Sequence, residues 1–104
     1  MLIFDDYKNR KIRYTNERIK HSESSHPEMV HQLEKIKEAV LHPDFVIGSK
    51  ADSEVELLYK YYQTTPVKSK YLCVTIKYRG SDNFIITAYF TDAIKKGKSL
   101  WEKK

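Results

Sequence analysis

The chain has very little cysteine and no long apolar run. Its single cysteine, Cys73, excludes an intrachain disulfide. Because Cys73 lies inside a strand-like apolar run, we expect a buried thiol rather than a nucleophile. No apolar stretch approaches the length of a membrane span, and the N-terminus lacks the hydrophobic segment and cleavage site of a signal peptide. We therefore expect a soluble, cytoplasmic protein.

The histidines do not form a metal-binding motif. His21 and His26 are separated by an expected helix break, and their spacing is not that of a zinc site. His31 and His42 have the character of surface positions. We therefore expect neither a metal nor a cofactor.

Acidic residues are scarce outside the middle of the chain. Residues 1–20 hold six Lys/Arg against three Asp/Glu, residues 21–58 hold three against eight, and residues 59–104 hold ten against three. This gives a net charge of +5 with a strongly basic C-terminal half. Such a distribution indicates a polyanionic ligand or an acidic protein partner. The alternative is an ordinary solvated, lysine-rich surface.

The first half of the chain has helical patterns. A length of 104 residues predicts one domain over residues 1–104. Thr15 is a suitable N-cap for a short helix that the serine-rich segment 22–25 ends. A second, amphipathic helix is expected over 27–41, with Pro27 in its first turn. Its buried positions recur at helical spacing and are Val30, Leu33, Ile36 and Val40.

The second half has strand patterns. Strands are expected over 45–49, 54–62, 71–78 and 84–90, and segment 11–14 is a further short strand or an edge. Residues 79–83 form the expected hairpin loop. The sequence thus predicts an α+β fold in which one or two N-terminal helices pack on a four- to five-stranded antiparallel sheet.

The last hairpin has a predictable register if Tyr78 lies opposite Phe84. The apolar face then pairs Ile76 with Ile86, Val74 with Ala88 and Leu72 with Phe90. The other face pairs Thr75 with Thr87, Cys73 with Tyr89 and Tyr71 with Thr91. We expect the amphipathic helix on the apolar face. The hydroxyl-rich face is then left for solvent or a ligand.

A set of short motifs occurs in a fixed order along the chain. The motifs are His21, His26-Pro27-Glu28, Pro43-Asp44, Thr87-Ala88-Tyr89, Gly97 and Trp101. In this order the chain resembles, over residues 12–101, the phage and prokaryotic proteins grouped with the barnase–EndoU–colicin–RelE-like (BECR) nucleases. The resemblance implies a helix-then-sheet α+β fold and metal-independent RNA cleavage, often in a toxin or phage setting. Members often have an arginine just before His-Pro-Glu, where this chain has Ser25.

RNA cleavage without a metal needs a base, an acid and donors that hold the phosphorane charge. His21 is the first candidate for acid or base, because imidazole exchanges protons near neutral pH. Arg18, one helical turn earlier, is the expected phosphate clamp. Thr87 and Tyr89 share one strand face and are the expected donors. The alternatives are a surface histidine without a role and ordinary strand residues. His26 is interpreted as a structural, cap-like residue.

Basic and aromatic residues supply the expected binding surface. The candidate phosphate contacts are Lys70, Lys95, Lys96 and Lys98, with Lys60 and Lys77 in the wider group. Each one also fits a solvated lysine. Tyr59, Tyr61 and Tyr62 are candidate stacking platforms, of which we expect two in the core. Trp101 is expected to pack the C-terminal tail onto the sheet, with a turn at Gly97.

Three functions remain open from the sequence. The first is an endoribonuclease (a hydrolase of RNA), of which one form is a toxin with an acidic antitoxin or immunity protein as its inhibitor. The second is a non-catalytic RNA-binding or protein-interaction module on the same fold. The third is a phage-derived structural protein that does not contact nucleic acid. RNA is the expected partner for the first and for the RNA-binding form of the second.

Overall fold

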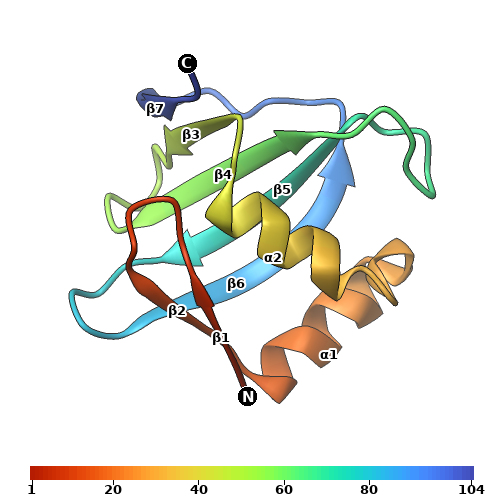
Figure 1. The fold of residues 1–104 in the computed structure, drawn as a ribbon, viewed down its shortest axis with the longest axis horizontal. Helices are drawn as coiled ribbons and strands as arrows, with labels where there is room; N and C mark the ends of the chain where they lie inside the picture. The colour runs from red at the N-terminus through yellow and green to blue at the C-terminus, as the bar shows by residue number, and fades with distance from the viewer.

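The fold is a seven-stranded mixed sheet with two α-helices and one short 3-10 helix. The computed structural model describes residues 1–104, and its sheet has the strand order β1-β2-β6-β5-β4-β3-β7. In chain order the elements are β1 (Leu2–Asp5), β2 (Lys11–Tyr14), α1 (Asn16–Ser25), η1 (Pro27–Met29), α2 (Leu33–Leu41), β3 (Phe45–Gly48), β4 (Val55–Tyr61), β5 (Tyr71–Lys77), β6 (Asn83–Thr91) and β7 (Lys98–Glu102). In Figure 1 α2 crosses in front of the central strands, and α1 lies beside them. None of the helices is long and apolar enough to cross a membrane.

The prediction of a four- to five-stranded antiparallel sheet is wrong. The segments 2–5 and 98–102 add one strand at each edge of the sheet. The segment 11–14 is a strand, and it pairs with β6 in parallel through Ile12–Asn83 and Arg13–Phe84. The two edge strands β1 and β7 escaped prediction because such short segments have few positions in which to show an alternating pattern. A two-residue parallel pair leaves no local signature at all.

The helical half also differs in detail from the prediction. Thr15 caps α1 as expected, and its hydroxyl accepts a hydrogen bond from the N–H of Arg18 at 3.2 Å. The serines of 22–25 continue α1 instead of ending it. The expected helix over 27–41 is interrupted at His31, whose φ of 68° lies in the left-handed region. It therefore consists of η1 and α2.

The main core lies between the sheet and the helices. Ile36 and Val40 of α2 are buried there, as predicted. Val30 and Leu33 are 42% and 37% exposed, so their predicted burial is wrong. The interruption at His31 changes which residues face the sheet, and Met29 and Ala39 take the buried positions instead.

A β-bulge changes one end of the predicted β5–β6 register. The predicted pairs from Tyr71–Thr91 to Thr75–Thr87 are all present. Beyond them the register shifts, so that Ile76 lies opposite Ile85 and Lys77 lies opposite Phe84. The extra residue on β6 places Ile86 against the face opposite the main core. The pairings Ile76–Ile86 and Tyr78–Phe84 are therefore wrong.

The turn between β1 and β2 is held by a buried carboxylate. Asp6 is fully buried and accepts hydrogen bonds from the N–H groups of Lys8 and Arg10 at 2.9 and 2.8 Å. It also accepts from Arg10 Nε and from the Tyr78 hydroxyl, both at 2.8 Å. Arg10 Nη2 reaches Glu56 Oε1 on β4 at 3.4 Å. These bonds join the hairpin turn to the central strands, and they satisfy the buried charge of Asp6.

Candidate nucleic-acid interface

The sheet face opposite the main core carries no helical residue in its apolar cluster. We call it the open face. Its buried centre consists of Val55, Leu57, Tyr59 and Cys73. Around this centre lie half-buried strand residues, namely Phe45, Ile47, Tyr71, Ile86 and Tyr89. Two rows of side chains therefore cross the face: Tyr59, Cys73 and Tyr89 in one, and Thr75 with Thr87 in the next.

Thr87 carries an unusual hydroxyl. The residue is partly exposed, but its Oγ1 is buried and has no hydrogen-bond partner. A buried hydroxyl without a partner costs free energy, and natural proteins contain few of them. Rotation about χ1 exchanges the hydroxyl and methyl positions of threonine. A hydrogen bond from the Thr87 hydroxyl to an incoming acceptor would therefore remove this free-energy cost.

Tyr89 is in contact with a histidine that we did not place in the site from the sequence. The rings of Tyr89 and His26 stack with centroids 5.2 Å apart and an interplanar angle of 29°. The His26 side chain is 35% exposed, and its Nδ1 lies 3.9 Å from Oε2 of Glu28. The side chain of His26 makes no capping hydrogen bond, so its interpretation as a cap is wrong. His26 is a half-exposed imidazole that contacts the open face through Tyr89.

The chemistry of the row through Cys73 favours donors over nucleophiles. Burial raises the pKa of the Cys73 thiol, and the Tyr89, Tyr59 and Thr75 hydroxyls only partly offset that shift. Cys73 is fully buried, which confirms the prediction of a buried thiol. Burial and the neighbouring thiol raise the pKa of Tyr89, and burial raises the pKa of Tyr59 to about 12. Both phenols stay protonated at neutral pH and can donate hydrogen bonds.

Arg18 and His21 lie on α1 rather than on the sheet. His21 is exposed and Arg18 is half-buried. Their three-residue spacing places them on neighbouring positions of the helix surface, as predicted. The Arg18 guanidinium and the His21 imidazole form no hydrogen bond, ion pair or ring contact. Thus the structure places His26, rather than His21, against the predicted donor Tyr89.

The predicted lysines lie in two places: Lys98 pairs with Gly48 at one end of the central strands, and Lys70 lies at the other end, before β5. Lys95, Lys96 and Lys98 are exposed in and after the segment that joins β6 to β7. The Lys95 N–H donates to the Tyr59 hydroxyl at 3.1 Å, and its charge acts on the Cys73 thiol. Lys70 lies just before β5, and its N–H donates to Asp92 at 2.8 Å.

Gly97 and Trp101 hold this C-terminal segment in place. A Cβ at Gly97 would lie 2.1 Å from the carbonyl oxygen of Gly48, so only glycine allows this close approach between the segment and β3. Trp101 packs against the main core, with its ring 5.1 Å from that of Tyr7. Trp101 thus packs the tail onto the sheet as predicted, but from within a strand.

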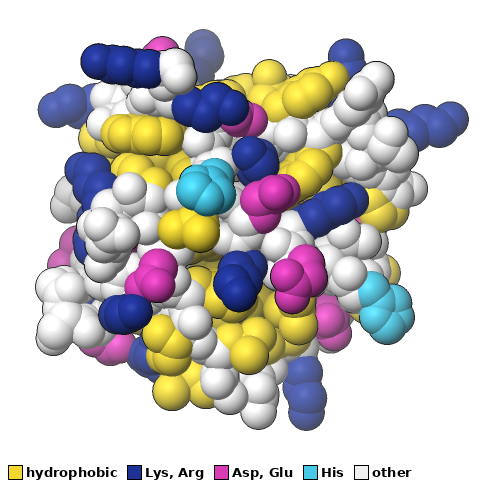
Figure 2. Space-filling view, viewed as in Figure 1, with side chains coloured by type: hydrophobic (Ala, Val, Ile, Leu, Met, Phe, Trp, Pro, Cys, Tyr) yellow, Lys and Arg dark blue, Asp and Glu magenta, His cyan; other side chains and the backbone are white.

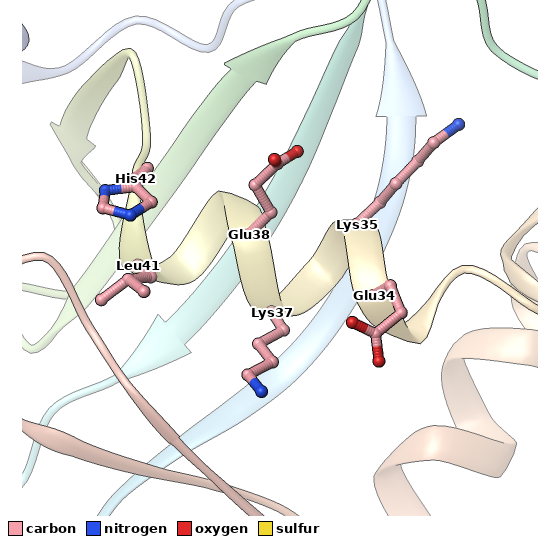
Figure 3. Close-up of a pocket in the computed structure, with 6 residues that line it drawn as sticks. All are labelled: Glu34, Lys35, Lys37, Glu38, Leu41 and His42. Atoms are coloured by element: carbon pink, nitrogen blue, oxygen red, sulfur yellow. The ribbon is translucent and has the colours of Figure 1, made fainter.

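Both cavities of the structure lie away from the open face. One, of about 350 Å³, runs along the outer side of α2 and is lined by Glu34, Lys35, Lys37, Glu38, Leu41 and His42 (Figure 3). The other, of about 380 Å³, lies beyond the end of α2, and its lining residues include Asp6, Tyr7 and Trp101.

The α2 side is a poor surface for a polyanion. Figure 2 shows acidic and basic side chains interspersed over it. The lining of the cavity along α2 contains two carboxylates and two ammonium groups. Nucleic acid needs no deep pocket, because single strands bind across sheet surfaces by stacking and phosphate contacts. The open face therefore remains the better candidate, although no cavity marks it.

Neither the residue clusters nor the comparisons with known proteins point to another function. No group of three or more His, Cys, Asp or Glu side chains is placed to hold a metal ion. The chain has no significant match to a protein-family model, a curated protein or a solved structure. The nuclease resemblance therefore stays a prediction that rests on the sequence motifs alone.

Proposed function

We propose that the protein is an endoribonuclease that cleaves RNA on the open face without a metal ion. The observation that carries this proposal is the stack of His26 on Tyr89, beside the unpaired hydroxyl of Thr87. An imidazole, a protonated phenol and a free hydroxyl are the groups that cleavage by 2′-hydroxyl attack requires. The lysines of segment 95–98 supply positive charge on the same side of the sheet.

In the proposed reaction His26 acts as the base. It takes the proton of the 2′-hydroxyl while the 2′-oxygen forms a bond to phosphorus. The bond from phosphorus to the 5′-oxygen breaks, and that oxygen takes a proton from His21 as the acid. Tyr89 and Thr87 donate hydrogen bonds to the non-bridging oxygens, and Arg18 binds a phosphate. The product is a 2′,3′-cyclic phosphate with a free 5′-hydroxyl.

The test is cleavage of an unstructured RNA in the presence of EDTA, with analysis of the RNA ends. We expect products that end in a 2′,3′-cyclic phosphate or a 3′-phosphate. The base must be neutral and the acid must be protonated, so the rate should have a bell-shaped pH dependence. Loss of all activity in EDTA, or 5′-phosphate products, would contradict the mechanism.

The second candidate is a module that binds RNA without cleaving it. Two observations favour it: the open face has no cavity, and the 3.9 Å between His26 Nδ1 and Glu28 Oε2 is too long for a hydrogen bond that would orient the imidazole. This candidate predicts RNA binding that weakens as salt rises, without any cleavage. In either case an acidic antitoxin or immunity protein would compete with RNA for the same lysines.

A further inference from the structure

The three tyrosines around the end of β4 have different environments. Tyr59 is fully buried on the open face. Tyr62 points to the α2 side, where its hydroxyl donates to Glu38 Oε1 at 2.5 Å. Tyr61 is 48% exposed, and it shares the open face with Tyr59 because the two are two residues apart on a strand. Tyr61 is therefore the tyrosine of this group that can stack a ligand.

Tyr61 belongs to a preorganised aromatic surface. Its ring lies edge-on to that of Tyr71, with centroids 5.8 Å apart and an interplanar angle of 72°. Tyr71 is held in turn by Phe45 and Tyr59, at 5.8 and 6.4 Å. The Tyr61 N–H donates to Asp44 Oδ2 at 2.7 Å, which fixes the backbone. Stacking of a base on the Tyr61 ring therefore costs little conformational entropy, because the ring is already held in place.

The charges near this surface suit a base that is linked to phosphates. Lys70 directly precedes Tyr71 and is exposed. The nearby carboxylates are already engaged: Asp92 accepts from the Lys70 N–H, and Asp44 is paired with Lys103 at 3.2 Å. The ends of β4 and β6 and the start of β5 lie side by side at the same end of the sheet (Figure 1). An anionic, aromatic ligand that stacks on Tyr61 therefore meets no unengaged carboxylate here.

We propose that Tyr61, backed by Tyr71, binds an unpaired nucleobase of the RNA, so that the substrate is single-stranded. This inference rests on the proposed function in taking RNA as the ligand. Strand spacings of about 4.8 Å and a rise of about 3.4 Å per residue place Tyr61 roughly 12 Å from Tyr89 across the sheet. A nucleotide a short distance along the same strand from the one at Tyr89 can reach that far. Bases inside a duplex are already stacked and cannot do so.

The experiment measures binding of a short single-stranded RNA that carries one 2-aminopurine, whose fluorescence reports stacking. Three proteins are compared: wild type, Tyr61→Phe and Tyr61→Leu. Phenylalanine keeps the ring and leucine keeps only apolar volume. We expect Tyr61→Phe to bind like wild type. We expect Tyr61→Leu to bind about 5- to 150-fold more weakly, as for the loss of one base–aromatic stack. The same strand in a duplex should bind weakly to all three.

The outcomes separate this inference from the proposed function. Equal affinity of Tyr61→Leu and wild type, with no change in the 2-aminopurine signal, would overturn the platform while leaving cleavage intact. Duplex binding as tight as single-strand binding would also overturn it. The absence of any RNA binding by wild type would overturn both proposals. Loss of affinity in Tyr61→Leu alone, in a protein that does not cleave, would support the platform and reject the nuclease.

Discussion

Replacing Thr87 by valine should make the protein more stable and less active. The substitution keeps the branched shape and removes the hydroxyl whose Oγ1 is buried without a partner. An unsatisfied buried polar group costs about 1–3 kcal/mol. Because Thr87 is partly exposed, we expect a gain near the lower end of this range, about 1 kcal/mol. For a domain of this size that gain raises Tm by roughly 4–8 °C.

The loss of activity has a separate cause. If the Thr87 hydroxyl turns toward the phosphate when RNA binds, valine removes one donor to the developing negative charge. Removal of one such donor typically costs about 10²–10³-fold in kcat. Thr87→Val should thus raise stability and lower kcat, which is the pattern of a site where function is maintained at the expense of stability.

The assay combines thermal unfolding with RNA cleavage, and Thr75→Val is the matched control. Thr75 lies opposite Thr87 on the same face, but its hydroxyl is not a buried, unpaired group. We expect no gain in Tm for Thr75→Val. A Tm of Thr87→Val several degrees below wild type would show that the hydroxyl has a partner in the free protein. A higher Tm with unchanged kcat would show that it does not touch the substrate.

Two further predictions concern packing and pH. Ile36→Ala should reduce the free energy of unfolding by about 2–5 kcal/mol because Ile36 is buried. Leu33→Ala should reduce it by less than about 1 kcal/mol because Leu33 is exposed. Equal losses in urea unfolding would refute the placement of α2. Burial alone would raise the pKa of Asp44, but hydrogen bonds from the Tyr61 N–H and the Lys103 ammonium outweigh burial and lower it below its usual value. Asp44 therefore stabilises the fold above its unfolded pKa, and that contribution disappears as the pH falls through the lower folded pKa. The difference in stability between wild type and Asp44→Asn should shrink below about pH 4, and a difference that stays constant down to pH 2 would contradict this assignment.

The sequence predicts the centre of the sheet well and its edges poorly. The pairing of 71–75 with 87–91 follows from alternation that both strands share, and so does the placement of Thr87 and Tyr89 on the open face. The bulge beside Ile86 has no such cause in the local pattern. It appears only when the strand has to fit its neighbours. The break at His31 is likewise a left-handed residue that helical periodicity does not reveal.

The candidate site was only half predictable for a related reason. Tyr89 and Thr87 were found because two residues of spacing fix a shared strand face. The contact between His26 and Tyr89 joins residues far apart in sequence, and a histidine before Pro27 fits a helix cap equally well. The sequence did contain one usable signal for Tyr61. Alternation places Tyr59 and Tyr61 on one face and Tyr62 on the other, so that Tyr62 cannot join the open face.

The most direct test of the nuclease proposal is the rate at which His26→Ala cleaves an unstructured RNA in EDTA, beside wild type and His21→Ala. Circular dichroism first establishes that the variants are folded. Loss of a general base predicts a rate about 10²–10⁴-fold lower for His26→Ala, with 2′,3′-cyclic phosphate ends formed by wild type. A folded His26→Ala protein that cleaves at the wild-type rate would contradict the role of the His26–Tyr89 stack.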